Sequence, residues 1–231
     1  YNTNMSSGLH IQPKREFNYK LLAFFVVLCI FGGMIAWYGW RYYIAGELPP
    51  IPIPISAGRT GIDETSVSAS QKQKHTTSGS QPKFLTIESL NVNQARVFPV
   101  GLRGNNEVDM PKNINDVGWY SKSSQPDEDI SVVLLSGHNT GIEKDGVFKN
   151  LSKLSDNSKI TIKRGDDRNI NYIVKSVKIV RVEDFNSAAT SEITKPIDET
   201  KQGVTLISDL GNWIPAKGTY DHRVIVRASE I

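Results

Sequence analysis

The chain has 231 residues and a formal net charge of +3, from 27 Lys and Arg against 24 Asp and Glu. This length allows one ordinary domain with attached segments. All of the charge excess lies before Pro82, and the neutral remainder lacks the basic face of a nucleic-acid-binding domain, so we expect no nucleic-acid partner. The single cysteine, Cys29, excludes an internal disulfide and a Cys-rich metal site.

An uncharged apolar run, LLAFFVVLCIFGGMIAWYGW, occupies residues 21–40. At helical rise this run spans roughly 30 Å, the thickness of a bilayer's hydrocarbon core. We therefore predict a transmembrane helix over 21–43, with aromatic residues crowded at its far end. Basic residues are more frequent before the run than after it, so the positive-inside rule predicts that 1–20 is cytoplasmic and the rest extracytoplasmic. The alternative is a cleaved signal peptide, but the run is long and no small-residue cleavage site follows closely, which favours an uncleaved signal anchor in the cell membrane.

Residues 44–82 have the composition of a linker. The stretch PPIPIPI at 49–55 predicts a stiff polyproline spacer, and the following Ser/Thr/Gln/Gly/Lys run predicts a flexible tether. A proline-rich ligand for an aromatic groove is the alternative, although a stalk explains the same composition.

Residues 83–231 are long enough for a hydrophobic core of their own. Short β-branched runs separated by Gly, Pro, Asn and Asp predict strands at 84–87, 95–99, 131–136, 159–164, 171–183, 204–208 and 223–228. Only 146–154 (GVFKNLSKL) favours a short helical turn. The pattern predicts a closed or sandwiched all-β domain.

Several strings in this domain occur in an order that resembles the sortase family. They are FLTIESLNVNQARVFPVG (84–101), VDMP (108–111), VGWY (117–120), SVVLLSGHNTG (131–141), GVFKNL (146–151), SDNSKITI (155–162), VTLISD (204–209) and HRVIVRAS (222–229). Sortases are membrane-anchored cysteine transpeptidases that join proteins carrying a sorting signal to the cell envelope, and VGWY is typical of their classes E and F. The resemblance implies a closed β-barrel with short helical turns, preceded by one transmembrane helix.

The resemblance assigns His138 as the catalytic histidine and Arg223 as the arginine that steadies the substrate carbonyl. The position of the nucleophilic cysteine is occupied by Asp209. A thiolate attacks an amide and persists as a thioester, whereas a carboxylate is a poor nucleophile that would give a mixed anhydride open to rapid hydrolysis. We therefore expect normal transpeptidation to be absent or very weak.

Three interpretations of Asp209 stay open at this point. The favoured one is an ion pair with Arg223 in a protein that binds sorting signals without cleaving them. The alternative is an active peptidase or transpeptidase in which Asp209 directs a water or a proton of His138 and Arg223 stabilises an oxyanion. The third is that Asp209 is a variant residue in an otherwise active enzyme.

Ser136 is a separate and weaker candidate for a nucleophile, since buried hydroxyl groups usually form hydrogen bonds with the backbone.

Aromatic side chains suit a groove for a Leu-Pro segment, so we predict peptide contacts from Trp119, Tyr120 and Trp213, the last in a loop at 210–220. No cofactor is expected. Calcium is a weak alternative, since some sortases bind it and acidic residues cluster at 127–129 and 183–184, but solvated surface charge explains these clusters better. The expected partners are surface proteins bearing sorting signals, the membrane, and an amine acceptor of the envelope if the chain is active.

Overall fold

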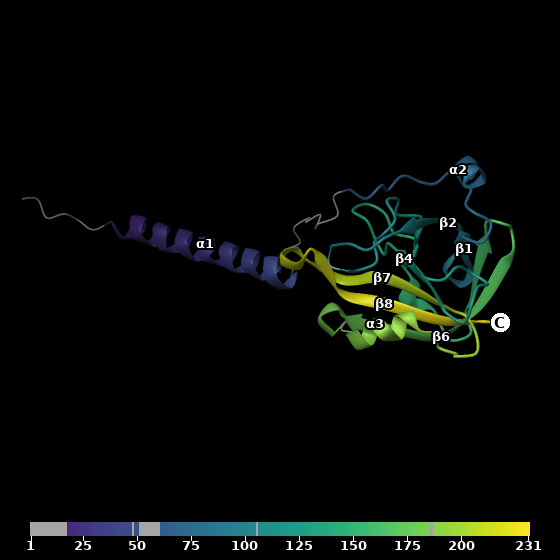
Figure 1. Ribbon diagram of the computed structural model, residues 1–231. Helices are drawn as coiled ribbons and strands as arrows, with labels where there is room; N and C mark the ends of the chain where they lie inside the picture. Colours follow the sequence, from purple (N-terminus) through teal and green to yellow (C-terminus); the bar gives the residue numbers. More distant parts are fainter. Residues whose placement is uncertain (1–17, 48, 51–60, 105, 185–186) are drawn as a thin grey trace, which may run out of the picture.

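Figure 1 shows a long helix joined to a β-barrel. This computed structural model describes residues 18–47, 49–50, 61–104, 106–184 and 187–231. Residues 1–17 of the cytoplasmic segment expected at 1–20, and most of the proline-rich spacer expected at 49–55, lie outside the described residues.

The long helix, α1 (Tyr19–Ala45), contains the apolar run, and its 27 residues correspond to a length of about 40 Å. Asn18 caps its start by accepting the backbone N–H of Leu21, and Gly46 ends it in a left-handed conformation at φ 68°. Its apolar side chains are exposed, and it is long and apolar enough to cross a membrane. This matches the predicted span.

The barrel consists of eight strands. They are β1 (Pro82–Ile87), β2 (Val92–Val100), β3 (Val117–Tyr120), β4 (Val132–Gly137), β5 (Lys159–Arg164), β6 (Asn169–Arg181), β7 (Gly203–Ile214) and β8 (Thr219–Glu230). In the part of the chain that the structure describes, the barrel is accompanied by two short helices, α2 (Ala69–Lys74) before β1 and α3 (Ser187–Thr194) between β6 and β7, and by four 3₁₀ turns, η1 (Glu88–Leu90), η2 (Leu151–Lys153), η3 (Val182–Asp184) and η4 (Pro215–Lys217).

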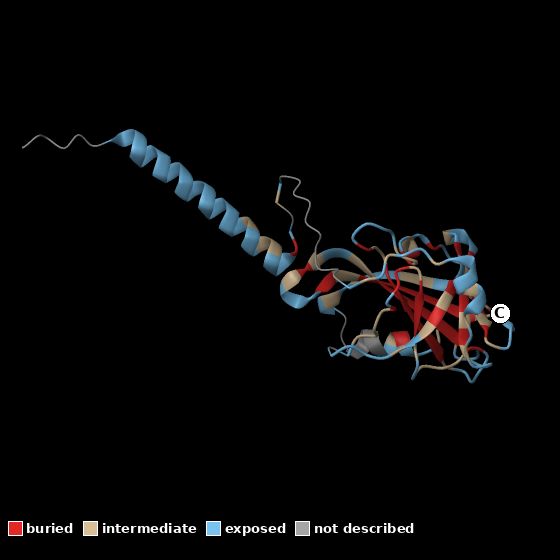
Figure 2. Cartoon of the chain, turned by 90° about the horizontal axis from the view of Figure 1, so that it is seen from above, coloured by how far each residue is buried: buried red, intermediate tan, exposed pale blue. Residues whose placement is uncertain are grey.

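The strands close in the order β1-β2-β3-β4-β7-β8-β6-β5. Two neighbouring pairs, β2 with β3 and β4 with β7, are parallel, and the other pairs are antiparallel. Alternate side chains point into the barrel, where Leu85, Leu135, Leu206 and Val226 are fully buried. Figure 2 shows this buried core inside the ring of strands.

The closed all-β barrel and all seven expected strands are confirmed. The structure adds β3, which is too short to be recognised by alternation. The loop expected at 210–220 is instead the end of a long β7–β8 hairpin. Gly211, at φ 86°, lies at an irregularity in the pairing, and η4 followed by Gly218, at φ 60°, makes the turn.

The second half of the expected linker differs from the prediction. Residues 61–81, which we call the strap, are not a free tether but lie along the barrel. Within the strap, α2 begins with a capping box in which Ser68 and Gln71 exchange side-chain and backbone hydrogen bonds. His75 then packs against Phe98, with ring centroids 4.7 Å apart. The capping box of α2 and the contact of the His75 ring with Phe98 hold the strap on the barrel. The low hydrophobicity of this segment had predicted a flexible tether.

Candidate functional site

The register of three neighbouring strands brings His138, Asp209 and Arg223 to one place. Gly137 at the end of β4 pairs with Ser208 of the parallel strand β7, and the Ser208 hydroxyl donates to the Gly137 carbonyl at 2.8 Å. His138 and Asp209 are the next residues along these two strands. Asp209 also pairs directly with Arg223 of β8. The three residues therefore share one level of the barrel wall.

Arg223 is the centre of a buried polar cluster. Its guanidinium lies 3.0 Å from an Asp209 carboxylate oxygen and 3.1 Å from Glu107. Three further acceptors come from its own hairpin: Thr219 Oγ1 at 2.5 Å, the His222 carbonyl at 3.1 Å and the Tyr220 carbonyl at 3.3 Å. Only 6% of Arg223 is exposed. One buried cation thus balances two carboxylates.

Burial raises the pKa of the Asp209 carboxyl above its ordinary value. The positive charges of Arg223, Arg103 and His138 oppose this rise, and the negative charge of Glu107 adds to it. The resulting group is a carboxyl that is held by a guanidinium yet binds its proton more tightly than an exposed aspartate. Such a group is able to exchange a proton nearer neutrality, although it remains a poor nucleophile.

His138 is buried beside this cluster, with 7% of its surface exposed. Its Nε2 lies 2.7 Å from the carbonyl oxygen of Pro111. Because a carbonyl only accepts, Nε2 must carry the proton of this hydrogen bond. In a neutral His138 the ring proton therefore lies on Nε2, and Nδ1 is the unprotonated ring nitrogen.

A cavity of about 400 Å³ lies on the outer face of β4, β7 and β8, and Asp209 and Arg223 line it. It is closed on one side by the loop that carries Glu107 and on another by α3. Most of the wall is apolar and includes Val108, Met110, Tyr120, Leu134, Ile193 and Ile207. An apolar cavity with a few convergent polar groups is typical of a ligand-binding site.

The three aromatic residues predicted to contact peptide are not brought together. Tyr120 lines the cavity. Trp119 instead belongs to the barrel core, 3% exposed, and its indole N–H donates to the Ser124 carbonyl at 3.1 Å. Trp213 lies near the hairpin tip, edge-on to the ring of Tyr220 at 5.3 Å. Alternation along β3 explains the separation of the neighbouring residues 119 and 120.

Ser136 also lines the cavity but is only 1% exposed. Its hydroxyl donates to the carbonyl oxygen of Asp109 at 2.7 Å. This bond to backbone is the ordinary arrangement for a buried serine hydroxyl. Ser136 thus has the surroundings of a structural residue.

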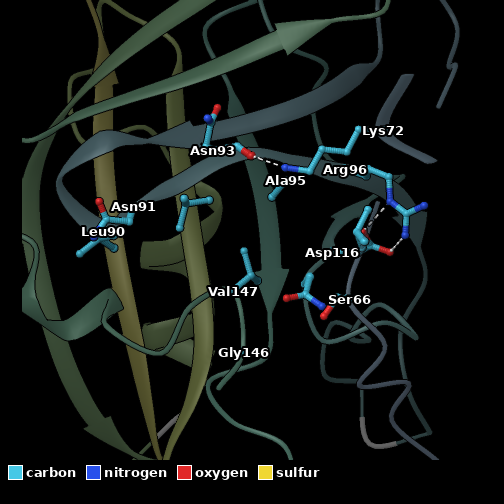
Figure 3. A pocket seen from close by; sticks show the side chains of 13 residues that line it. Ser66, Lys72, Leu90, Asn91, Asn93, Ala95, Arg96, Asp116, Gly146 and Val147 are labelled. Atoms are coloured by element: carbon cyan, nitrogen blue, oxygen red, sulfur yellow. Dashed lines mark hydrogen bonds and ion pairs between the residues drawn. The ribbon is translucent and has the colours of Figure 1, made fainter. Parts of the chain in front are cut away.

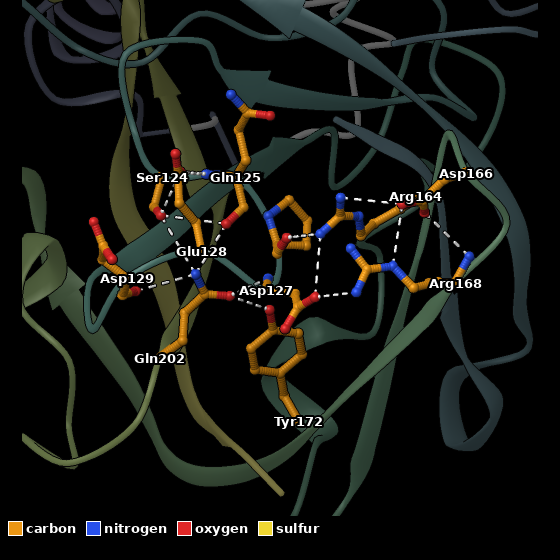
Figure 4. A network of polar contacts seen from close by, with 11 residues as sticks. Ser124, Gln125, Asp127, Glu128, Asp129, Arg164, Asp166, Arg168, Tyr172 and Gln202 are labelled. Atoms are coloured by element: carbon orange, nitrogen blue, oxygen red, sulfur yellow. Dashed lines mark hydrogen bonds and ion pairs between the residues drawn. The ribbon is translucent and has the colours of Figure 1, made fainter. Parts of the chain in front are cut away.

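Four of the acidic residues considered for calcium, Asp127, Glu128, Glu183 and Asp184, have protein partners for their carboxylates. Asp127 pairs with Arg164 at 3.3 Å and with Arg168 at 2.5 Å, within the polar network of Figure 4. Glu128 accepts the backbone N–H of Gln125 at 2.8 Å. Likewise, both acidic residues at 183–184 pair with Arg181. Within the described ranges, no three or more His, Cys, Asp or Glu side chains form a group able to hold a metal ion.

Glu107 is the residue of this site that sequence reasoning missed. It lies 116 positions before Arg223 in the chain and approaches it through a small turn in which Leu102 and Val108 form an isolated bridge. An acidic residue in a polar loop carries no periodic signal. Its only sequence cue is its place immediately before the VDMP string.

Solved structures similar to this chain are sortases. Sortase C-1 from Actinomyces oris is 20% identical, with 64% of this chain and 72% of that chain covered and a TM-score of 0.46. The lid mutant of sortase A from Corynebacterium diphtheriae is 17% identical, with 70% and 75% covered and a TM-score of 0.48. The pilus-related sortase C of Group B Streptococcus is 18% identical, with 77% of each chain covered and a TM-score of 0.48. These values assign no activity and no residue role.

No curated protein matches this chain. The family model for the sortase domain matches residues 85–231, which is most of the chain and includes His138, Asp209 and Arg223. With the barrel and its site described, this match completes the identification: the chain belongs to the sortase family.

Proposed function

We propose that this chain is a membrane-anchored sortase-family protein that binds sorting-signal peptides of the Leu-Pro-x-Thr-Gly type outside the membrane without normal transpeptidation. In this proposal Asp209 stands where a sortase has its nucleophilic cysteine, and the chain is of the class E or F type. The proposed division is a cytoplasmic segment at 1–20, a signal anchor at 21–43, a linker at 44–82 and the binding domain at 83–231. The strap adds contacts to that domain.

The observation that carries the proposal is the 3.0 Å contact between Asp209 and the buried Arg223. The contact holds the Asp209 carboxyl against Arg223, and a carboxyl group is a poor nucleophile toward an amide. The single cysteine, Cys29, lies in α1 and not in the barrel. The chain therefore has no thiol with which to form a thioester at this site.

The cavity supports peptide binding. Its apolar wall, including Tyr120 and Ile207, suits the Leu and Pro side chains of a sorting signal, and its polar end at Arg223 suits a backbone carbonyl. Peptide binding at this polar end requires no chemistry from Asp209. The corresponding partners are surface proteins that carry a sorting signal.

One observation favours an active enzyme as the second candidate. Burial raises the pKa of Asp209, and a carboxyl that keeps its proton closer to neutrality suits acid–base work on a bound water. In that case His138, Asp209 and Arg223 would serve hydrolysis, or transfer to an amine of the envelope.

The test compares the native chain with Asp209→Cys in detergent micelles, using a fluorogenic Leu-Pro-x-Thr-Gly peptide with and without an added amine. We expect the native chain to bind the peptide and leave it intact. The Asp209→Cys variant should cleave it and transfer the acyl group to the amine, because the thiolate attacks the Thr carbonyl, the Thr–Gly bond breaks and the glycine amine leaves with a proton.

Asp209→Cys combined with His138→Ala is the matched control, and it should lose the gained cleavage. Cleavage by the native chain that disappears in Asp209→Asn would refute the binding proposal and establish the hydrolase. Absence of peptide binding by the native chain would refute both the binder and its substrate class.

A further inference from the structure

The carboxylate of Glu64, in the strap, accepts three consecutive backbone N–H groups of the loop that follows His138. Ile142 donates to Oε1 at 2.6 Å, and Glu143 and Lys144 donate to Oε2 at 2.9 and 2.8 Å. Successive N–H groups that point at one anion form an anion-binding nest in a turn. Here the anion comes from a residue 78 to 80 positions away in the same chain.

The loop fixed by Glu64 is tied to the His138 backbone. The Phe148 N–H donates to the His138 carbonyl at 2.9 Å, and the Gly146 N–H donates to the Asn139 carbonyl at 2.8 Å. The approach is so close that a Cβ at position 146 would overlap the His138 carbonyl, which only glycine avoids. Displacement of the loop would therefore move His138.

The residue beside Glu64 fixes the other contact of His138. Asp63 exchanges backbone hydrogen bonds with the segment 112–114, at 2.9 Å each, and its carboxylate accepts the side-chain amide of Asn113 at 2.9 Å. This segment directly follows Pro111, whose carbonyl oxygen accepts the His138 ring at 2.7 Å. Glu64 thus supports the loop that is bonded to the His138 backbone. The adjacent Asp63 supports the segment that follows Pro111, the hydrogen-bond partner of the His138 ring.

After Thr65, a cavity of about 410 Å³ lies between the strap and the barrel as far as Lys72, whose Nζ donates to the Asn93 carbonyl at 2.6 Å. Figure 3 shows Ser66 of the strap on one side of it and Gly146 and Val147 on another, with Arg96 and Asp116 joined at its edge. The attachment at Asp63 and Glu64 therefore rests on discrete hydrogen bonds, and the ring contact of His75 with Phe98 lies on the far side of this cavity.

We propose that Glu64 is a positioning residue for His138, through which the strap between the membrane helix and the barrel sets the geometry of the peptide-binding site. The assignment of His138 to that site rests on the proposed function, whereas the positioning itself does not. Because Asp63 and Glu64 are adjacent in the strap, displacement of the strap would loosen both supports of His138 together.

The experiment uses the full chain in detergent micelles. Amide hydrogen exchange is measured at 142–147, and the hydrogen-bonded Nε2–H proton of His138 is followed by NMR, assigned by its loss in His138→Gln. In Glu64→Ala we expect exchange at 142–144 to rise about tenfold or more, as for a lost charge-assisted hydrogen bond, and the Nε2–H signal to broaden or disappear. Glu64→Gln keeps one acceptor oxygen and should give intermediate values of both.

Glu143→Gln is the matched control, because it removes the same charge from an exposed side chain in the same loop and keeps the backbone N–H. Exchange in Glu64→Ala as slow as in this control would overturn the proposal. Faster exchange with an unchanged Nε2–H signal would overturn it too, since Glu64 would then order the loop without positioning His138. If these signals respond but the native chain binds no sorting-signal peptide, the proposed function fails and the positioning role stands.

Discussion

Arg223 decides the electrostatics of the site. It is the cation shared by Asp209 and Glu107, and Thr219 and two carbonyls of its own hairpin hold its side chain in place. Both carboxylates therefore depend on the same guanidinium for their counter-charge. Removal of Asp209 leaves Arg223 with a counter-charge, whereas removal of Arg223 leaves two partly buried acidic groups without their shared cation.

The corresponding prediction contrasts Arg223→Met with Asp209→Asn. Arg223→Met should lower the free energy of unfolding by about 3–5 kcal/mol, the usual cost of leaving buried charge uncompensated, and Asp209→Asn should change it far less. Thermal or urea unfolding of the full chain in detergent measures both. Equal destabilisation by the two variants would contradict the sharing of Arg223.

The raised pKa of Asp209 gives a second prediction with a definite sign. A carboxyl with a raised folded pKa contributes stability that is fully present below its unfolded pKa of about 3.9 and is lost as pH rises through the folded value. The stability of the native chain relative to Asp209→Asn should therefore fall as the pH rises from about 4 toward neutrality. Unfolding of both proteins across that range checks it, and a constant difference would rule out the raised pKa.

The strap is an element with two different kinds of attachment. Hydrogen bonds from Thr65 and Asn113 lower the pKa of Asp63 to about 2, and the backbone N–H of Ile142 is the main cause that lowers the pKa of Glu64. Both carboxylates thus stay charged in mild acid. At the other end, burial lowers the pKa of His75, whose ring lies against Phe98 and whose Nε2 is 3.1 Å from the Val97 carbonyl.

These shifts predict that mild acid loosens α2 but not the Glu64 end. A histidine with a lowered folded pKa contributes stability that is present above its unfolded pKa of about 6.5 and lost as pH falls below it. Nearby Arg96 strengthens this effect and Asp116 weakens it. Hydrogen exchange at 69–75, corrected for intrinsic rate, should accelerate between pH 7.5 and pH 5.5, while 142–144 keeps its protection. His75→Gln should remove this pH dependence. If the pH dependence persists in that variant, the effect belongs to a group other than His75.

At the scale of the whole molecule, the end of the apolar helix meets the hairpin that carries the site. Gly46, the left-handed cap of α1, is buried against the backbone carbonyl of Trp213, which occupies the place that a Cβ would need. β7 and β8 continue from this contact to Asp209 and Arg223. A membrane around α1 would therefore lie at the hairpin end of the barrel.

Membrane orientation is tested by labelling with an impermeant maleimide on intact cells, in a Cys29→Ala background. Ser80→Cys, beyond the helix, should react from outside, and Ser7→Cys, before it, should react only after permeabilisation, because the excess of basic residues favours a cytoplasmic N-terminus. The reverse pattern would place the barrel in the cytoplasm and contradict the proposed partners.

The local pattern of apolar and polar residues was sufficient to predict the apolar helix and most of the strands. Both kinds of element show their pattern within a few neighbouring residues. The ordered strings predicted roles for His138, Asp209 and Arg223, and the strand register explains why these three residues lie close together. Four-residue β3 and the hairpin beyond Leu210 were not recognised, since a short strand and a strand with a glycine irregularity show no clean alternation.

Contacts between distant segments were decided only by the tertiary structure. Glu107 reaches Arg223 across 116 positions, and Glu64 reaches Ile142 across 78. Both are acidic residues in polar surroundings, where composition alone predicts solvated charge. What the sequence by itself determined is therefore the long apolar helix, the all-β barrel and the presence of an aspartate at position 209. Closure of the barrel determined which charged residues meet around Arg223. It brings together loops that lie far apart in the sequence, and no local sequence pattern predicts such contacts.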